Sequence, residues 1–414
     1  MKFSIATFNV ENLITADKPI YDEPKPRYTK EQYLKKTNWI KNQLVKMNAD
    51  IIGFQEIFEE QALRDCLVGT PMEKWNLFVA NPTGKSPVNA ILSKFPILKT
   101  EIFEDVPFVF DFFDDKAMAV TLGSIPINIP IKKFSRGILN AEIKLNDRVS
   151  VLVAVLHLKS KNPIYHNGFD RDKATYPEMA MGSVRSLIRR GIEACGIRQI
   201  LSDEINKDES KPIFILGDLN DNDTAVTNQS ILGEDPFRTL PPDEKIKRWK
   251  HVFQNCKDVQ ARKSIENFHY TYIHNGHYES LDNIFISNHF AELNSKRIGR
   301  IIDVRLYNDH VIDDKTSLDR KPVYVSDHGQ VVANIDLLEP ITINIRKHVK
   351  ELLGRELINE EIEMIQLNKD FGELMNFKEW LEMDFNIIIE PKELSDCIIV
   401  SDVCDLVENK LNIK

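Results

Sequence analysis

Carboxylates, amides and histidines follow several buried apolar runs of this sequence at the points where those runs end. In "PIFILGDLNDN", the apolar run leads into Asp218, Leu219 and Asn220. Side chains alternate along a strand, so Asp218 and Asn220 project to one side while Leu219 points back. Taken alone, the stretch is explained equally well as a turn, because Gly, Asp and Asn leave a strand at low cost.

The same cue recurs at other strand ends. The residues concerned are Asn9 and Glu11 in "TFNVEN", Glu56 after "DIIGFQ", His157 in "VLVAVLHLKSK", Asp282 in "LDNIFIS", and Asp327 and His328 in "VSDHGQVV". A lone histidine in an apolar run is usually a satisfied core residue. The recurrence, with residue types that suit one chemistry, favours a shared site.

That chemistry is the hydrolysis of a phosphate ester. A hard divalent cation prefers oxygen ligands, which Glu56, Asn9 and Asp327 can supply, and it offsets the charge that builds on the phosphate. An attacking water needs a base within reach, and Asp218 is the candidate.

The remaining polar residues fit supporting roles. Neutral donors such as Asn9 and Asn220 orient oxygens without adding repelling charge, while His157 and His328 can stabilise the developing anion. We expect Asp282 to hold the His328 ring and to favour its protonated form.

These side chains need a mixed framework of strands and helices. Strands are predicted at 3–10, 50–55, 88–93, 137–145, 149–158, 212–217, 281–287 and 329–337. Helices are predicted at 30–48 and 178–206, the second with its apolar face at Met181, Val184, Leu187, Ile188 and Ile192. The pattern indicates an α/β or α+β domain. The Phe- and Pro-rich segment 104–135 is either an inserted loop over a cleft or partner surface, or an irregular buried connection.

The motifs "TFNVENL", "IIGFQE", "HLKSK", "GDLNDN", "SLDNIFIS" and "SDHG", in this order, resemble the endonuclease/exonuclease/phosphatase superfamily. That group includes pancreatic-type DNase, apurinic-site endonucleases, inositol phosphatases and sphingomyelinases. The resemblance implies a four-layer α/β/β/α sandwich and hydrolysis of phosphoesters that depends on Mg²⁺ or Mn²⁺.

The resemblance also implies the site, residue by residue. Its catalytic residues would be Asn9, His157, Asp218, Asn220, Asp282 and His328, and its metal ligands Glu56, Asn9 and Asp327. Glu11 is a less secure match to a second acidic residue. Arg136 and Lys159 would bind substrate, although an ordinary surface Arg explains Arg136 equally well.

Within the superfamily, "ATFNVENL" and "HLKSK", followed by a long helix with Arg185 and Arg198, look most like bacterial nuclease-type members. Asn283 departs from the pattern, since many relatives have Tyr or His there. The implied activity is a nuclease cutting DNA or RNA. The alternatives are a phosphatase or phosphodiesterase acting on lipid or inositol phosphates, and a catalytically idle adaptor, against which the intact residue set speaks.

The character of the chain changes at Pro340, which predicts a catalytic domain at 1–338 and a helical domain at 341–414. Helices are predicted at 343–355, 371–385 and 401–412. The segment 381–411 is similar to the last part of an acyl carrier protein. The serine that takes the phosphopantetheine arm is missing, with Phe371 at its position in an ungapped match, so no phosphopantetheine is expected. The tail is either an acidic docking module for a protein partner or a helical cap.

Composition limits the class of protein further. The 414 residues carry a formal charge of −9, and residues 341–414 hold 9 basic against 16 acidic residues, so the first domain is nearly neutral. An acidic total does not favour nonspecific coating of nucleic acid. No run is apolar enough for a membrane span, and five scattered cysteines without a CxxC pair predict reduced thiols in a cytoplasmic protein.

Overall fold

The structure is a computed structural model. It describes residues 1–21, 25–112, 127–166, 169–233, 239–263, 270–274, 276–291, 294, 297–313, 320–338, 340–353, 364, 370–385 and 387–411.

One six-stranded sheet is built around the N-terminal strand. Its strands, in spatial order, are β15 (Gly299–Tyr307), β16 (Gln330–Leu337), β1 (Lys2–Leu13), β2 (Ile51–Ile57), β4 (Val88–Ser93) and β3 (Asn76–Val79). The strands β1 and β2 are parallel, with Asn9 opposite Gln55, so their carboxyl ends lie at the same edge of the sheet.

The second six-stranded sheet has its own parallel pair at the centre. Its strands, in spatial order, are β11 (Phe253–Asn255), β14 (Asp282–Ser287), β10 (Ile213–Asp218), β9 (Ser150–His157), β8 (Lys133–Lys144) and β5 (Ile97–Asp105). The strands β9 and β10 are parallel, and β14 runs antiparallel to β10. The end of β9, the end of β10 and the start of β14 therefore meet at one edge.

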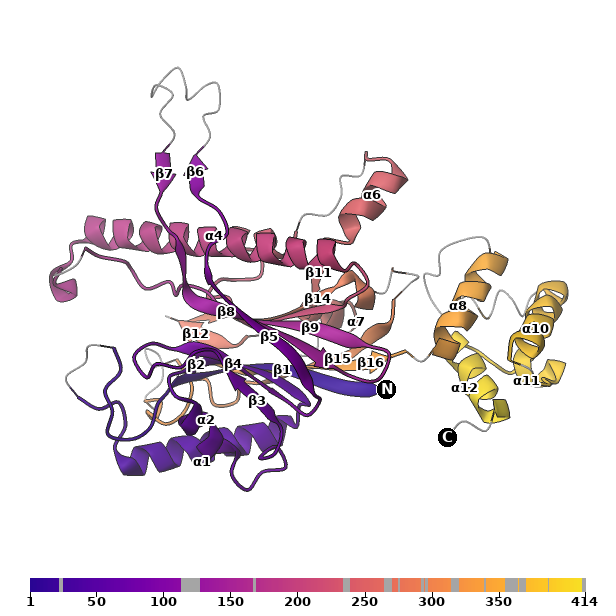
Figure 1. Cartoon of the computed structure of the whole chain (residues 1–414), viewed down its shortest axis with the longest axis horizontal. Coiled ribbons are helices and arrows are strands. Elements are labelled where there is room, and N and C mark those ends of the chain that lie inside the picture. The colour runs from indigo at the N-terminus through magenta and orange to yellow at the C-terminus, as the bar shows by residue number, and fades with distance from the viewer. Residues whose placement is uncertain are drawn as a thin grey trace, which may run out of the picture. The chain divides into compact units, whose positions relative to one another are not determined.

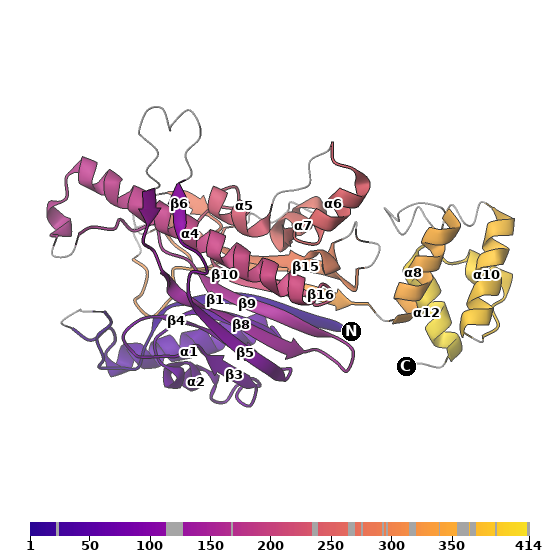
Figure 2. The same cartoon turned by 45° about the horizontal axis from the view of Figure 1, so that its top comes forward.

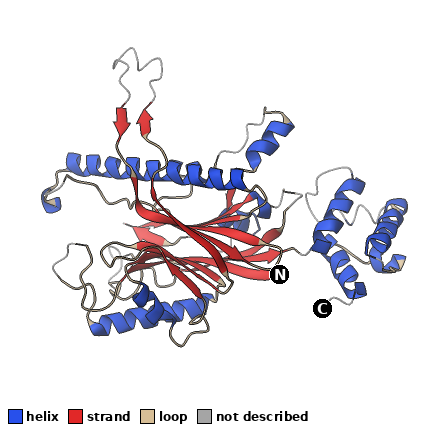
Figure 3. Ribbon diagram, in the orientation of Figure 1, coloured by secondary structure: helices blue, strands red, loops and turns tan. Residues whose placement is uncertain are grey.

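The two sheets lie face to face with helices on both outer sides, as Figures 1 and 3 show. The helices are α1 (Lys30–Met47), α2 (Glu60–Leu67), α4 (Tyr176–Lys207), α5 (Val226–Leu232), α6 (Pro242–Trp249) and α7 (Cys256–Lys263). One apolar core fills the space between the first sheet and the helices α1 and α2, and another lies between the second sheet and α4. This confirms the predicted α/β/β/α sandwich.

Close approach of the sheets depends on Gly53 in β2. A Cβ atom added there would lie 3.0 Å from Leu216 Cδ1 and 3.2 Å from the Val155 methyl groups. Both contacts come from the facing sheet, so the absence of a side chain at Gly53 lets the two layers meet at this point.

Capping explains where the long helices begin. Thr29 and Gln32 form a capping box at the start of α1, and Asn48 ends that helix in the left-handed conformation. Thr175 and Glu178 form the same box at the start of α4, which runs across the second sheet (Figure 2).

The predicted apolar face of the 178–206 helix is wrong for its first half. Met181, Val184 and Leu187 are 50%, 54% and 50% exposed. The buried face there is polar and carries Gly182, Ser186, Arg190 and Glu193, whereas Ile192 is buried as predicted. Gly182 receives the loop that follows β9: a Cβ atom on it would lie 2.8 Å from Pro163 Cβ. A polar loop backbone, rather than apolar side chains, is what this part of α4 packs against.

The segment 104–135 contains a small hairpin of β6 (Phe110–Phe112) and β7 (Ile127–Ile129), which projects beyond α4 in Figure 1. Val106 and Phe134 at its base are buried in the core under α4. Residues 113–126 lie outside the described residues, so both sequence interpretations of the segment stay predictions. A second hairpin, β12 (Tyr272–His274) and β13 (His277–Glu279), precedes β14.

The last part of the chain is helical, as predicted. Its helices are α8 (Pro340–Leu353), α10 (Phe371–Phe385), α11 (Pro391–Ser395) and α12 (Val400–Leu411), and they share an apolar core of their own. Residues after 353 and after 411 in the predicted helices lie outside the described residues. The chain clusters into two compact units, one of residues 4–287 and 303–334, the other of 1–3, 288–302 and 335–414. The boundary at 338–341 and the likeness to acyl carrier proteins stay predictions. Among the described helices, none is long and apolar enough to cross a membrane.

Candidate active site

Strand register places three of the polar residues side by side. Asp218 at the end of β10 lies directly opposite His157 of β9 and, on its other side, directly opposite Asp282 of β14. Residues opposite one another in a sheet share a face, so the three side chains project together. Asp218 is the central member of the row and is only 1% exposed.

The first sheet contributes two side chains to the same place. Asn9 Nδ2 donates to Asp218 Oδ2 at 3.0 Å and to Glu56 Oε1 at 3.4 Å. His157 Nε2 lies 3.4 Å from Asp218 Oδ2 and 3.8 Å from Glu56 Oε1. Residues from four strands in two sheets thus meet around one carboxylate.

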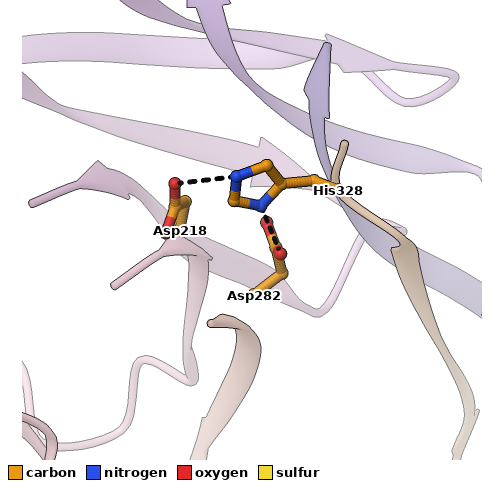
Figure 4. Close-up of side chains that lie close together, drawn as sticks. All are labelled: Asp218, Asp282 and His328. Atoms are coloured by element: carbon orange, nitrogen blue, oxygen red, sulfur yellow. Dashed lines mark hydrogen bonds and ion pairs between the residues drawn. The ribbon is translucent and has the colours of Figure 1, made fainter. Parts of the chain in front are cut away.

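His328 completes the cluster from the turn before β16. Its Nδ1 lies 2.8 Å from Asp282 Oδ2, and its Nε2 lies 3.8 Å from Asp218 Oδ2 (Figure 4). The turn is fixed by Ser326, whose hydroxyl donates to Asn9 O at 2.8 Å and accepts from His328 N–H at 3.1 Å. The histidine ring therefore bridges two carboxylates in a set orientation.

Burial and neighbouring charges shift the pKa values of the carboxyl and imidazole groups of the cluster in different directions. Burial raises the pKa of Asp218 to about 7, with His328 opposing and Asp282 adding to the rise. Burial disfavours a charged His328, but the carboxylates of Asp282 and Asp218 outweigh it and raise the pKa of that imidazole well above its usual value. Burial, with Arg136 next, holds the pKa of His157 well below its usual value. His328 is thus the cationic histidine and His157 the neutral one.

Asn220 closes the turn that follows β10. Its backbone N–H donates to Asp218 Oδ1 at 2.8 Å, while its side-chain amide donates to Leu158 O at 3.1 Å and to Asp218 Oδ2 at 3.2 Å. Asn220 has φ 53°, and Glu56, Glu11 and Asn12 also have positive φ. Such conformations cost energy in non-glycine residues and concentrate at functional sites.

A model of the Endonuclease/Exonuclease/phosphatase family matches residues 6–328, a span that contains every residue of this cluster. The chain belongs to the endonuclease/exonuclease/phosphatase family. A search of curated proteins found no match.

Several solved structures resemble this chain at low sequence identity. Truncated TDP2 from Caenorhabditis elegans is 14% identical, with 81% of this chain and 97% of that chain covered and a TM-score of 0.46. TDP2 from D. rerio, complexed with a single-strand DNA product, is 14% identical, with 81% and 99% covered and a TM-score of 0.46. The human Nocturnin catalytic domain with bound sulfate is 13% identical, with 81% and 94% covered and a TM-score of 0.46.

The family implies a divalent metal, and the donor set at the site suits one. Glu56 Oε2 accepts from Asn12 N–H at 2.8 Å, but among the described residues Glu56 Oε1 has only the contacts at 3.4 and 3.8 Å to Asn9 and His157. Within the described part of the chain, no Lys or Arg forms an ion pair with Glu56. A carboxylate oxygen with one long hydrogen bond, and with no Lys or Arg partner among the described residues, is the kind of atom that a hard cation binds.

A second set of atoms has metal-ligand spacing. Asp218, Asp282 and His328 offer ligand atoms that all lie within 4.8 Å of one another. In this set His328 Nδ1 already contacts Asp282 Oδ2 at 2.8 Å, and Asp218 Oδ2 accepts from Asn9 and Asn220. Glu56 Oε1 is less engaged, so Glu56 stays the predicted anchor of the ion.

Two further acidic residues predicted for the site, Asp327 and Glu11, differ in the partners that they have. Asp327 is half-buried, and its charge acts on His328 and Glu11. Glu11 forms ion pairs with Lys321 at 2.6 Å and with Arg27 at 3.3 Å, so its carboxylate is already engaged. The metal-binding role of Asp327 stays a prediction.

The two predicted substrate-binding cations lie near His157. Arg136 donates to Leu158 O at 3.0 Å, and its charge depresses the pKa of His157. Lys159 Nζ instead donates to its own loop, at Ser160 O, Ser160 Oγ and Asn162 O. Burial, with Arg136 next, lowers the pKa of Lys159 to about 8. Both substrate-binding roles stay predictions.

Sequence reasoning missed the residues that support the cluster from α4. Asp221, which the sequence analysis did not single out, forms an ion pair with the buried Arg190 at 3.0 Å and accepts from Thr227 Oγ1 at 2.8 Å. Glu193, also buried, accepts the backbone N–H groups of Ser135 and Lys159. The available signal was the polar spacing of Ser186, Arg190 and Glu193 along a helix otherwise expected to bury apolar residues.

Proposed function

We propose that this protein is a metal-dependent phosphodiester hydrolase, and specifically a nuclease that cuts DNA or RNA by in-line attack of an activated water. The observation that carries the proposal is the position of Asp218: a buried carboxylate in contact with a neutral His157, an amide from Asn9, and His328 held by Asp282. Family membership supports phosphoester hydrolysis as the reaction class.

Each side chain has a role that follows from its atoms. Asp218 Oδ2 accepts a proton from the attacking water, and a carboxyl pKa of about 7 suits that task near neutral pH. Asn9 Nδ2 and Asn220 Nδ2 donate to the same oxygen and fix its orientation. His328, held as a cation by Asp282, presents Nε2–H to the phosphoryl oxygen on which charge develops.

The remaining groups bind the ion and the phosphate. Glu56, with Asn9 and Asp327, would hold a Mg²⁺ or Mn²⁺ ion, which supplies Lewis-acid stabilisation of charge on the phosphate. Arg136 is half-buried beside His157, within reach of a phosphate bound there, and a guanidinium offers two parallel donors to phosphate oxygens.

Substrate choice is tested directly. Purified full-length protein is incubated with Mg²⁺ or Mn²⁺ and with plasmid DNA, single-stranded DNA, RNA or phosphoinositides, and Asp218→Ala serves as the inactive control. Strand cutting that Asp218→Ala loses supports the nuclease. Release of a head group without strand cutting would replace the nuclease with a lipid or inositol phosphodiesterase, and equal cutting by Asp218→Ala would refute the site.

We also propose that the acidic C-terminal helices dock a protein partner. Supporting this, Phe371, Met383, Ile388 and Ile398 are large apolar side chains left exposed on that bundle. A chain ending after residue 338 is compared with the full chain. If it keeps both activity and partner binding and loses only solubility, the helices are a cap instead.

A further inference from the structure

One face of α4 is both buried and polar over two helical turns. It carries Ser186, Arg189, Arg190 and Glu193, at the i, i+3, i+4 and i+7 spacing that ordinarily brings apolar residues onto a sheet. Ser186, Arg190 and Glu193 are buried, and Arg189 is half-buried. A buried charge is costly unless it is paired and hydrogen-bonded, so the partners of these groups show what the face does.

Glu193 joins the backbones of two separate strands. Its Oε1 accepts from Ser135 N–H at 2.7 Å, near the start of β8, and its Oε2 accepts from Lys159 N–H at 2.8 Å, just after β9. Ser135 immediately precedes Arg136, and Lys159 lies two residues beyond His157. Arg189 Nε lies 3.3 Å from Glu193 Oε1 and neutralises the carboxylate.

Arg190 and Ser186 hydrogen-bond to the loop after β9 and to the turn after β10. Arg190 Nε donates to Asp221 Oδ2 at 3.0 Å, next to Asn220, and its Nη1 donates to Lys159 O at 3.2 Å. Ser186 Oγ donates to Ser160 O at 2.6 Å. Groups from one helix face therefore fix the chain after β8 begins, after β9 ends and after β10 ends.

These contacts converge on the carbonyl group between His157 and Lys159. Leu158 O accepts from Arg136 Nη1 at 3.0 Å and from Asn220 Nδ2 at 3.1 Å. Leu158 C=O and Lys159 N–H belong to one planar peptide unit, so whatever holds Lys159 N–H also orients Leu158 O. The carboxylate of Glu193 thereby fixes the position of Leu158 O, to which the proposed site residues Arg136 and Asn220 both donate.

We propose that Glu193 is a positioning residue of the hydrolytic site: it holds the Leu158–Lys159 peptide and Ser135, and through them Arg136, His157 and Asn220. This rests on the proposed function. A carboxylate is required because two backbone donors on opposite sides must be satisfied by one side chain, and buried backbone N–H groups left without an acceptor are strongly disfavoured.

The test is Glu193→Gln in the full chain. A glutamine has one acceptor oxygen, so its amide NH₂ would face one of the two N–H donors, at Ser135 or Lys159. We expect kcat/KM to fall about 10- to 100-fold and backbone amides in 133–136 and 156–162 to exchange hydrogen faster. Glu204→Gln is the matched control, since Glu204 lies on the same helix and pairs with Lys207 at 2.6 Å, and it should leave both measurements unchanged.

A double-mutant comparison separates positioning from general structural damage. If Glu193 acts partly through Arg136, Glu193→Gln lowers kcat/KM by a smaller factor when Arg136→Ala is present than it does alone. Full multiplication of the two effects would overturn the route through Arg136, and wild-type kinetics of Glu193→Gln would overturn the whole proposal. Should Glu193→Gln fail to fold, Glu193→Asp, which keeps both acceptor oxygens on a shorter side chain that cannot reach both N–H groups at once, takes the same test.

Failure of the positioning role of Glu193 can be distinguished from failure of the proposed function. If the wild-type protein hydrolyses no substrate in the panel, the proposed function fails, and the positioning role is judged by hydrogen exchange alone. Unchanged exchange at 156–162 in Glu193→Gln would then overturn it. If the wild-type protein is active and Glu193→Gln is indistinguishable from it, only the positioning role fails.

Discussion

Asp282→Asn tests the electrostatic core of the proposed mechanism. Asp282 Oδ2 lies 2.8 Å from His328 Nδ1, and the only other acidic contact of that ring within the described chain is Asp218 at 3.8 Å. Asparagine has the same shape and can still present an oxygen to Nδ1–H. The substitution therefore removes the negative charge while keeping the hydrogen bond.

The size of the effect follows from the distance. The charge centres of a carboxylate and an imidazolium joined by such a hydrogen bond lie about 4 Å apart, and two unit charges at that separation attract by about 4 kcal/mol at an effective dielectric of about 20. The neutral hydrogen bond that asparagine retains offsets about 1 kcal/mol of the loss. The remaining loss of about 3 kcal/mol lowers the pKa of His328. At a pH above that lowered pKa, a transition state that needs the imidazolium loses about 100-fold in kcat/KM.

The lowered pKa of His328 determines in which direction the pH dependence of kcat/KM moves. The pKa of His328 is raised in the folded protein, so the cation persists at neutral pH. In Asp282→Asn the cation is lost at lower pH, and the alkaline limb of kcat/KM should move to lower pH. NMR titration of the histidine side-chain nitrogens gives the same pKa without any need for turnover.

The control is Asp147→Asn, an exposed carboxylate that pairs with Lys144 at 2.7 Å, and it should change neither measurement. If Asp282→Asn leaves both the alkaline limb and the titration of His328 where they were, Asp282 does not hold the proton on that ring. The reasoning from geometry to a cationic His328 would then be refuted.

Three further predictions concern stability and metal binding. Gly217→Ala should lower the free energy of unfolding by about 3 kcal/mol in urea titrations, because its Cβ would overlap the carbonyl oxygen of Leu156; a loss below about 1 kcal/mol would contradict this. Burial lowers the pKa of Lys36 from 10.5 to about 8. Below pH 8 the folded protein therefore holds a buried charged lysine, which lowers the free energy of unfolding. This loss of stability disappears as the pH rises towards 10.5. Lys36→Met should therefore raise stability at pH 7 by about 3 kcal/mol and flatten the rise between pH 8 and 10, and equal urea midpoints at pH 7 would contradict it. Mn²⁺ binding measured by calorimetry should weaken at least tenfold in Glu56→Gln and little in His328→Gln; the reverse order would move the ion to the Asp218, Asp282 and His328 group.

The strands that carry the site were predictable from sequence because each is an apolar run with a polar residue at its end. The predicted strand at 88–93 matches β4 residue for residue, and 212–217 differs from β10 by one position at each end. Short edge strands such as β3 and β11 were missed, since three or four residues give too little alternation to recognise.

The core of the candidate site followed from the same strand ends. Asn9, Glu56, His157, Asp218, Asp282 and His328 come together as a cluster in which all but the half-buried Glu56 are buried, although their roles stay predictions. What the sequence did not show is how the backbone between them is held. Lys159 was expected to face substrate, yet its amine is bound within its own loop, and its backbone N–H is the group that matters to Glu193.

The misread face of α4 shows why the supporting residues escaped prediction. Periodicity identifies the buried side of a helix only when that side packs against apolar neighbours. The first half of α4 packs against a loop backbone, whose N–H and C=O groups require charged and hydroxyl partners, so Glu193 and Arg190 are inside and Leu187 is outside. Strand register places His157, Asp218 and Asp282 with no further help, because paired strands oppose them directly. Lys159 and Asn220 lie in loops that have no such register, and Arg136 lies near the start of β8, before its pairing with β9 begins. For that reason we expect the function to depend on α4 as much as on the sheet residues themselves.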